Sequence, residues 1–131
     1  MAKMTTALSL LAVYFIITTS AFNNEELPEQ ECPVDCHCHY FRVNWVTDCS
    51  DSNLTTIPYN ELSHNVYILD MNDNNIADIS PFPESIKLRR LQMAHNRLTE
   101  LTYESFAGLT YLLDADFSYN AITRVDPEAF R

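Results

Sequence analysis

The chain has 131 residues, of which 18 are acidic and 8 are basic, and its formal net charge is −10. This charge argues against nucleic acid and anionic lipid surfaces as partners, because both attract basic proteins. The single glycine, Gly108, argues against glycine-rich phosphate loops, dinucleotide fingerprints and nucleophile elbows, which need two or more glycines. No nucleophile motif stands near any of the four histidines. We therefore expect a protein that is not an enzyme and that carries no cofactor.

The first 21 residues predict a secretory signal peptide. One basic residue, Lys3, precedes an apolar run at residues 7–17, and small residues stand at Thr19 and Ala21. The run is too short for a membrane span, which needs about 20 residues. We expect a secreted chain that begins near residue 22 and inserts no segment into a membrane. Residues 22–31, which carry four glutamates, are predicted to form an acidic, disordered leader.

All four cysteines fall between residues 32 and 49, with the spacing C-x3-C-x-C-x10-C. An even, clustered set in a secreted chain predicts two disulfides, although four cysteines allow three pairings and the spacing does not choose among them. The alternative is a metal or redox site, because Cys36 and Cys38 alternate with His37 and His39 and zinc favours such ligands. The signal peptide, the tight spacing and the lack of a second CxxC or HxxxH pair favour disulfides, with both histidines in an exposed loop. A free-thiol titration distinguishes the two interpretations.

The segment at residues 53–55, Asn-Leu-Thr, is the only N-x-S/T sequon of the chain. In a secreted protein this sequon makes Asn53 a candidate for glycosylation. The alternative interpretation is that Asn53 serves only in a turn.

The second half of the chain repeats itself. The segments VYILDMNDNNIADI, LRRLQMAHNRLTEL and LLDADFSYNAITRV align on Asn74, Asn96 and Asn120, which are 22 and 24 residues apart. A fixed period of this length predicts a solenoid. The same apolar positions recur in each copy: Val66, Leu69, Met71, Ile76 and Ile79; then Leu88, Leu91, Met93, Leu98 and Leu101; then Leu112, Ala115, Phe117, Ile122 and Val125.

Each copy predicts one short strand of a parallel sheet. In the second copy Leu91 and Met93 alternate with Gln92 and Ala94, so one face of the strand is buried and the other is exposed. The turn after the strand buries backbone groups that need partners, and a carboxamide offers a donor and an acceptor on a short stem. We therefore expect the three aligned asparagines to form a structural ladder, with one rung per repeat.

The template LxxLxLxxNxLxxL resembles that of the leucine-rich repeats, and YESFAGLTYL adds Phe106, Leu109 and Leu112 at the spacing of extracellular repeats. The cysteine cluster resembles the N-terminal cap of such proteins, which include Toll-like receptors and adhesion and guidance proteins. The resemblance implies an α/β-type solenoid, a right-handed horseshoe segment with a short parallel β-sheet on its concave face and an irregular or 3-10 convex side. It also implies a disulfide-stapled cap with the pairs Cys32–Cys38 and Cys36–Cys49.

We expect the cap to cover residues 32–60 and to include a short antiparallel hairpin with Val43, Trp45 and Thr47, which shields the first coil. Residues 61–131 then form about three repeats, the last of them incomplete. The far end lacks a cap, which should leave five side chains partly open to water: Ala115, Phe117, Ile122, Val125 and Phe130. Either the chain is the N-terminal piece of a membrane receptor or adhesion ectodomain, or a second chain covers this end by self-association.

The residues between the buried positions are predicted to point out of the concave sheet in four columns. The columns are Val46, Ile68, Arg90 and Asp114; Asp48, Asp70, Gln92 and Asp116; Ser50, Asn72, Ala94 and Ser118; and Asp51, Asp73, His95 and Tyr119. Asp48 beside Asp70, and Asp51 beside Asp73, place like charges on neighbouring strands. A solvated face tolerates such pairs, and a basic partner neutralises them.

Aromatic and arginine side chains dominate interfaces, so Ile68, Arg90 and Tyr119 favour a recognition surface. The family resemblance adds the expectation of a secreted, non-enzymatic module that binds an extracellular protein through this acidic face. We expect Gln92, Ala94 and His95 to touch the partner. The full predicted face comprises Asp48, Asp51, Ile68, Asp70, Asn72, Asp73, Arg90, Gln92, His95, Asp114, Asp116 and Tyr119.

Overall fold

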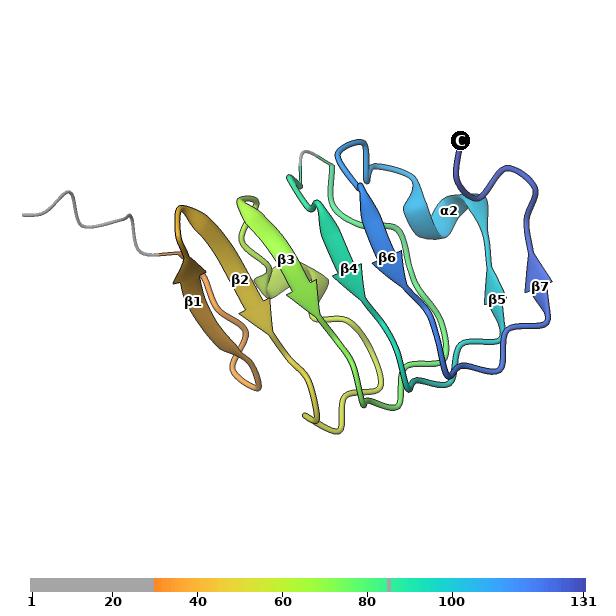
Figure 1. Cartoon of the computed structure of the whole chain (residues 1–131), viewed down its shortest axis with the longest axis horizontal. Helices are drawn as coiled ribbons and strands as arrows, with labels where there is room; N and C mark the ends of the chain where they lie inside the picture. Colours follow the sequence, from red (N-terminus) through yellow and green to blue (C-terminus); the bar gives the residue numbers. More distant parts are fainter. Residues whose placement is uncertain (1–29, 85) are drawn as a thin grey trace, which may run out of the picture.

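The computed structural model describes residues 30–84 and 86–131. The predicted signal peptide and all but the last two residues of the predicted leader lie outside these ranges. The described chain is a solenoid whose coils follow one another along one axis, and each coil adds a strand to a common sheet (Figure 1). The predicted solenoid with a short, mainly parallel sheet and a disulfide-stapled cap is therefore confirmed.

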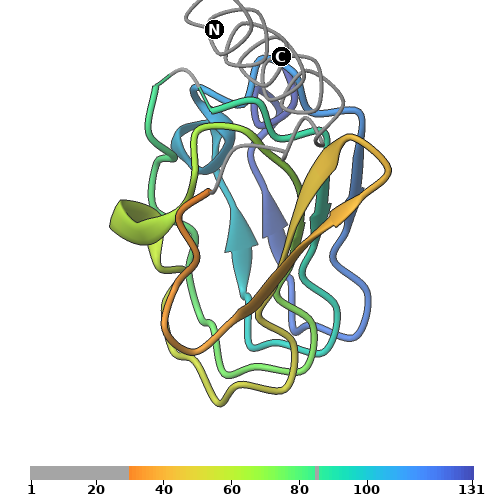
Figure 2. The same ribbon diagram turned by 90° about the vertical axis from the view of Figure 1, so that its left-hand side faces the viewer.

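The main sheet has five strands in the order β1-β2-β3-β4-β6. These strands are β1 (His37–Phe41), β2 (Asn44–Asp48), β3 (Val66–Asp70), β4 (Arg90–Gln92) and β6 (Asp114–Asp116). Strand β1 runs antiparallel to β2, whereas the other neighbours pair in parallel. Seen along the solenoid, the sheet lies on one side of the coils and the 3-10 helix η1 (Tyr59–Glu61) lies on the opposite side (Figure 2).

The apolar positions of the repeats fill the interior. Leu69 and Leu91 lie at matching positions in β3 and β4, and Met71 and Met93 follow at the ends of these strands. All four side chains are completely buried. Burial of one such side chain stabilises the fold by about 1.5–3 kcal/mol. The spacing that defines the repeat is thus the spacing of the core.

The aligned asparagines connect consecutive coils. Oδ1 of Asn96 accepts a hydrogen bond from the Ile76 amide at 3.0 Å, and its Nδ2 donates to the carbonyl oxygens of Met71 at 2.9 Å and Met93 at 3.2 Å. Asn74 and Asn120 make the equivalent contacts one coil earlier and one coil later. Each carboxamide therefore satisfies backbone groups of two coils at the turn after a strand.

The convex side contains more regular structure than the sequence predicts. Besides η1 it has the short helix α2 (Tyr103–Phe106) and a second sheet, in which β5 (Glu100–Leu101) pairs in parallel with β7 (Arg124–Val125). Thr102 caps α2, because its Oγ1 accepts a hydrogen bond from the Ser105 amide at 3.3 Å. The repeat template says nothing of these elements, since they form at its variable positions.

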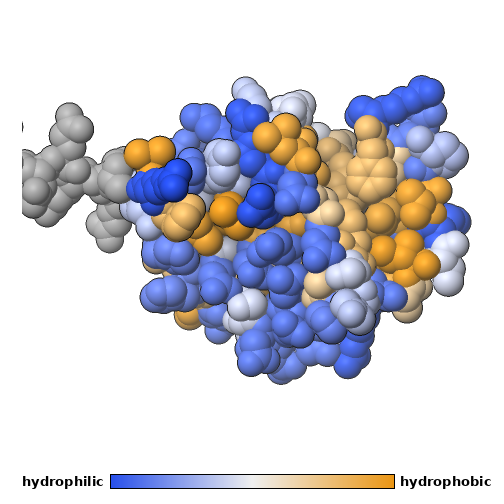
Figure 3. All heavy atoms as spheres, in the orientation of Figure 1, coloured by the Kyte–Doolittle hydropathy of each residue, from blue (hydrophilic) through white to orange (hydrophobic). Residues whose placement is uncertain are grey.

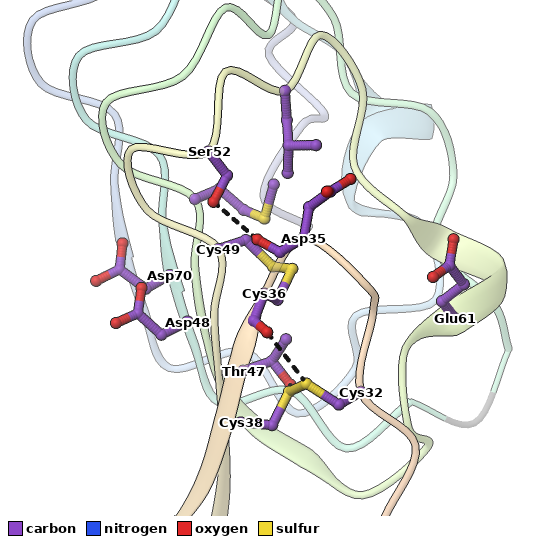
Figure 4. The surroundings of a disulfide bond; sticks show 12 residues. Cys32, Asp35, Cys36, Cys38, Thr47, Asp48, Cys49, Ser52, Glu61 and Asp70 are labelled. Carbon is purple, nitrogen blue, oxygen red and sulfur yellow. Dashed lines mark hydrogen bonds between the residues drawn. A yellow bond between two sulfur atoms is a disulfide. The ribbon is translucent and has the colours of Figure 1, made fainter.

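Two disulfides lie within the cap (Figure 4). Cys32 is bonded to Cys38 and Cys36 to Cys49, the pairs that the resemblance implies. Cys49 is completely buried, so the second bridge reaches the core, whereas Cys32 is exposed. The cap therefore has one structural bridge inside the molecule and one near its surface.

The cap hairpin differs from the prediction at one residue. Trp45 and Thr47 lie in β2 as expected, but Val43 lies in the turn between β1 and β2 and is 77% exposed. Its neighbour Arg42 has a φ of 58°. The left-handed conformation at Arg42 turns the chain back on itself and carries Val43 out of the strand.

The opposite end of the solenoid exposes apolar side chains, and Figure 3 shows them gathered there. The ring of Phe106 packs against those of Phe117 and Phe130, with centroids 5.6 and 4.9 Å apart. These three rings line a hollow of about 500 Å³. Phe130 nevertheless stays 63% exposed. Within the described chain, the last coil is thus covered on one side only.

Candidate interaction face

Side chains that alternate with the core residues form two rows across the concave side of the main sheet. The strand register places His39, Val46, Ile68, Arg90 and Asp114 in the first row and His37, Asp48, Asp70, Gln92 and Asp116 in the second row. Strands in a sheet lie about 4.8 Å apart, so adjacent members of a row are neighbours in space. Two of the predicted columns coincide with these rows, and β1 extends each row by a histidine.

Asp48 and Asp70 stand side by side in the second row, with their carboxylates directed away from the sheet (Figure 4). Oδ1 of each carboxylate caps the end of its own strand. It accepts a hydrogen bond from the Ser50 amide at 3.0 Å in one case and from the Asn72 amide at 3.0 Å in the other. One oxygen of each residue thus has a structural role, and the side chains still face the concave side.

The two carboxylates differ in their electrostatic environment. Burial raises the pKa of Asp70, and the charges of Asp48 and Asp73 raise it further, although the hydrogen bond from Asn72 acts in the opposite direction. Burial also acts on Asp48, but the hydrogen bonds from Ser50 and the nearby histidines outweigh it and lower its pKa. Of the two carboxylates, Asp70 is therefore the one whose pKa is raised by repulsion from its neighbours.

The first row ends in an ion pair. Nε of Arg90 lies 3.0 Å from Oδ2 of Asp114, and both side chains are at least half exposed. At this exposure such a pair contributes at most about 1 kcal/mol to stability. The pair also compensates the charge of Arg90 locally, so the face keeps its acidic character at Asp48 and Asp70.

The column that begins at Asp51 forms a rim beyond the strands rather than part of the sheet. Asp73, His95 and Tyr119 each lie directly before a ladder asparagine, and Asp51 takes the corresponding position in the first coil. All four residues have left-handed backbone conformations, with φ values of 49°, 56°, 54° and 54° in chain order. The rings of His95 and Tyr119 stack, with centroids 4.2 Å apart and planes inclined by 7°. Tyr119 is 76% exposed, so this stack is accessible.

In the column between the second row and the rim, Ala94 is buried, Ser50 and Asn72 are half-buried, and Ser118 is exposed. Ala94 is only 7% exposed, and contact between Ala94 and a partner stays a prediction. The carboxamide oxygen of Asn72 accepts a hydrogen bond from the Ala94 amide at 2.7 Å, which gives Asn72 a structural contact between coils. The physical reason for the burial of Ala94 is that the chain curls inward after each strand to reach the ladder asparagine.

The sequence interpretation missed the contribution of β1 to the face. His37 and His39 were predicted to lie in an exposed loop, but they lie in an edge strand whose register with β2 places them in the two rows. The alternation in HCHYF contained this signal, because Cys38 and Tyr40 are less exposed than the residues around them. The same alternation of cysteines and histidines also fits a metal site, so the pattern alone does not identify a strand.

Asn53, the predicted glycan site, is exposed, and its Oδ1 accepts a hydrogen bond from Nδ2 of Asn75 at 2.8 Å. It also has a positive φ of 54°, which fits the alternative role of a turn residue. Glycosylation of Asn53 stays a prediction.

All four cysteines are bonded in disulfides, so the cap has no free thiolate of the kind that a metal or redox site would need. Across residues 30–84 and 86–131, no three His, Cys, Asp or Glu side chains are grouped to hold a metal ion. In the same part of the chain, no helix has the length and apolar character needed to cross a bilayer.

Stacked coils, an asparagine ladder and a cysteine-rich cap together define a leucine-rich-repeat protein. Residues 86–131 match the family described as "Leucine rich repeat". The chain is 36% identical over 101 residues to the leucine-rich repeat-containing G-protein coupled receptor 5 of Homo sapiens, an alignment that covers 75% of the chain and 11% of the receptor. It is 31% identical over 105 residues to the leucine-rich repeat-containing protein 3 of Danio rerio, with 80% of the chain and 31% of that protein covered. The chain therefore contains leucine-rich repeats and is similar to these proteins, and it spans only a small part of their length.

Proposed function

We propose that the chain is a secreted, non-enzymatic module that binds an extracellular protein through its concave face and rim. Stacked repeats present an extended, rigid concave surface, which is the surface that solenoid proteins use for binding. The observation that carries the proposal is the exposed stack of His95 and Tyr119 beside the acidic second row. An accessible aromatic anchor next to a row of like charges suits recognition better than it suits stability.

An extracellular location is supported by the two disulfides, since such bridges persist in oxidising compartments. The predicted signal peptide points the same way. The negative net charge of −10 favours a partner with a basic contact surface.

Binding to an array of purified extracellular proteins tests the proposal, followed by affinity measurements with variants for each protein that binds. Tyr119→Ala should weaken binding about tenfold, because truncating an aromatic anchor at an interface typically costs about 1.4 kcal/mol or more. Tyr103→Ala is the matched control, since Tyr103 is 51% exposed in α2 on the convex side. If only Tyr103→Ala weakened binding, the concave face would be the wrong surface.

A second candidate function is that of the front segment of a longer membrane receptor or adhesion ectodomain. The observation in its favour is the similarity to a G-protein coupled receptor of which the chain spans 11%. Sequencing the transcript beyond the codon for Arg131 tests this candidate. An open reading frame that continues with further repeats supports it, and a stop codon after Arg131 contradicts it.

A further inference from the structure

The concave face contains a cleft at the junction between the cap and the repeats. The cleft has a volume of about 300 Å³, and its walls come from four neighbouring strands, β1 to β4. This volume is at the lower end of the range for ligand pockets, about 300–1,000 Å³. It therefore suits a single long side chain of a partner rather than a larger molecule.

The floor of the cleft is apolar. Val46 and Ile68 are adjacent in the first row, and the exposed ring of Phe41 in β1 forms a side wall. Val46 points to the concave side, yet it is only 8% exposed. A residue of an outward-facing row that is so little exposed must lie at the bottom of a hollow. The aliphatic stem of a long side chain that lies along this floor would bury apolar surface and would remove little polar surface from water.

One end of the cleft is acidic. Asp48 and Asp70 lie two residues further along β2 and β3 than Val46 and Ile68, a distance of about 6.6 Å along the strands. Their Oδ1 atoms accept the amide hydrogen bonds described above. Among the described residues, neither Oδ2 atom has an ion-pair partner. Two carboxylates side by side fit the planar, forked guanidinium group, which binds two oxygen atoms at once.

The basic groups near the cleft are engaged elsewhere or lie at its margins. Arg90 at the far wall pairs with Asp114 at 3.0 Å. Arg42 at the hairpin turn lies over the ring of Phe41, 5.7 Å from its centroid. His39 lines the cleft, and the charges of His39 and His37 help to lower the pKa of Asp48. Neither arginine therefore neutralises the two carboxylates at the acidic end of the cleft.

We propose that this cleft is a specificity pocket for an arginine side chain of the partner protein, with its stem on Val46 and Ile68 and its guanidinium group between Asp48 and Asp70. The inference rests on the proposed function and deepens it, because it names the side chain that one part of the face recognises. The arginine neutralises the like charges that the register forces together. A lysine places a compact charge at the same end without the two-pronged contact.

The test is a titration of the ¹⁵N-labelled chain with N-acetyl-arginine methylamide, followed by amide chemical shifts. N-acetyl-citrulline methylamide is the uncharged analogue of nearly the same shape, and N-acetyl-lysine methylamide is the compact cation. The expected result is a saturable shift of the amides of β2 and β3 with the arginine probe. The affinity for the lysine probe should be at least about fivefold weaker, and the citrulline probe should give no saturable shift. Equal shifts with citrulline would remove the role of charge, and equal affinity for lysine would overturn the assignment to arginine.

Two variants and a matched control locate the effect. Asp48→Asn and Asp70→Asn keep an oxygen to accept the strand-end hydrogen bond and remove one charge, so each should weaken the arginine probe about two- to fivefold. Asp116→Asn changes the same charge in the same row outside the cleft, and Asp116 caps its strand in the same way, accepting from the Ser118 amide at 2.9 Å. This control should leave the affinity unchanged. An equal loss in Asp116→Asn would mean that general acidity, not the cleft, attracts the probe.

The two proposals fail in distinguishable ways. If Tyr119→Ala weakens partner binding but the arginine probe does not bind in the cleft, the proposed function is retained and the arginine pocket is overturned. A cleft that binds the probe, together with partners that are insensitive to every concave variant, would overturn the proposed function and leave the pocket as an unrelated site.

Discussion

The two ends of the solenoid differ in how well the core is covered. At the N-terminal end a hairpin and two disulfides cover the first coil, and Val66 and Leu69 behind them are completely buried. At the C-terminal end the equivalent cover is absent from the described chain, and Val125 and Phe130 are 49% and 63% exposed. Ile79 and Leu101, which occupy the template position of Val125 in the first two copies, are only 7% and 4% exposed. The same template position is therefore buried or exposed according to its neighbours. A coil of this fold has no core of its own and shares one with the coils on either side.

The largest effect is expected from breaking the cover at the N-terminal end. The double substitution Cys36→Ala with Cys49→Ala should lower the free energy of unfolding by about 2–5 kcal/mol, because it removes a bridge that reaches the core. The double substitution Cys32→Ala with Cys38→Ala should cost less. That bridge spans 6 residues rather than 13 and lies nearer the surface. Unfolding in guanidinium chloride, followed by circular dichroism, measures both. A larger loss from the outer bridge would contradict this account of the cap.

A smaller effect should separate the middle of the ladder from its open end. Asn96→Ala leaves buried backbone groups of Met71 and Ile76 without partners, which costs about 1–3 kcal/mol for such a group. Asn120 makes the same set of contacts but is less buried, so water can replace part of them and Asn120→Ala should cost less. Urea unfolding of both variants measures the difference. Asn60→Ala, at an exposed residue of η1, is the control, and equal losses at positions 96 and 120 would mean that the open end is sheltered in solution.

The smallest effect concerns charge on the concave face. The pKa of Asp70 is raised in the folded protein, so the folded state binds this proton more tightly than the unfolded state does. The destabilisation by ionised Asp70 is absent below the unfolded value of 3.8 and complete above the raised value. Stability should therefore gain from Asp70 as the pH falls through this window. Asp70→Asn should be more stable than the parent at pH 7, by less than about 1 kcal/mol because the site is partly solvated.

Urea unfolding at several pH values between 3 and 7 measures this difference, which should disappear at the acid end. Asp116→Asn provides the opposite sign. Hydrogen bonds from Ser118 lower the pKa of Asp116, so the ionised form stabilises the fold and its contribution is lost as the pH falls. If the two variants changed stability in the same direction at pH 7, the contrast between the two carboxylates would be refuted.

The features of the fold that repeat could be predicted from the sequence. The period fixed the positions of Leu69, Leu91 and the ladder asparagines, because stacking requires the same residue types at the same place in every coil. The alternation within each strand also predicted that Asp48 and Asp70 are neighbours. These relations involve short-range periodicity, which a single sequence displays directly.

The features that occur once could not be predicted in the same way. The position of His37 and His39 within the hairpin, the helix α2 and the pairing of β5 with β7 depend on contacts that no repeat records. The cleft needs Phe41 and His39 from the cap against Ile68 from the first repeat, and such a meeting follows only from the register between the two. The burial of Ala94 likewise depends on the inward course of the turn rather than on the type of residue.

The left-handed backbone at the rim determines how substitutions at these four positions affect stability and binding. Glycine adopts such a conformation freely, whereas other residues lose about 1 kcal/mol or more, and bulky side chains lose more than aspartate or histidine do. The chain nevertheless has only one glycine in total, and it places tyrosine at the last of the four rim positions. Selection for thermal resistance alone should therefore replace Tyr119 with glycine and erase the aromatic stack. Stability engineering and recognition draw on the same four positions, and they favour different residues there.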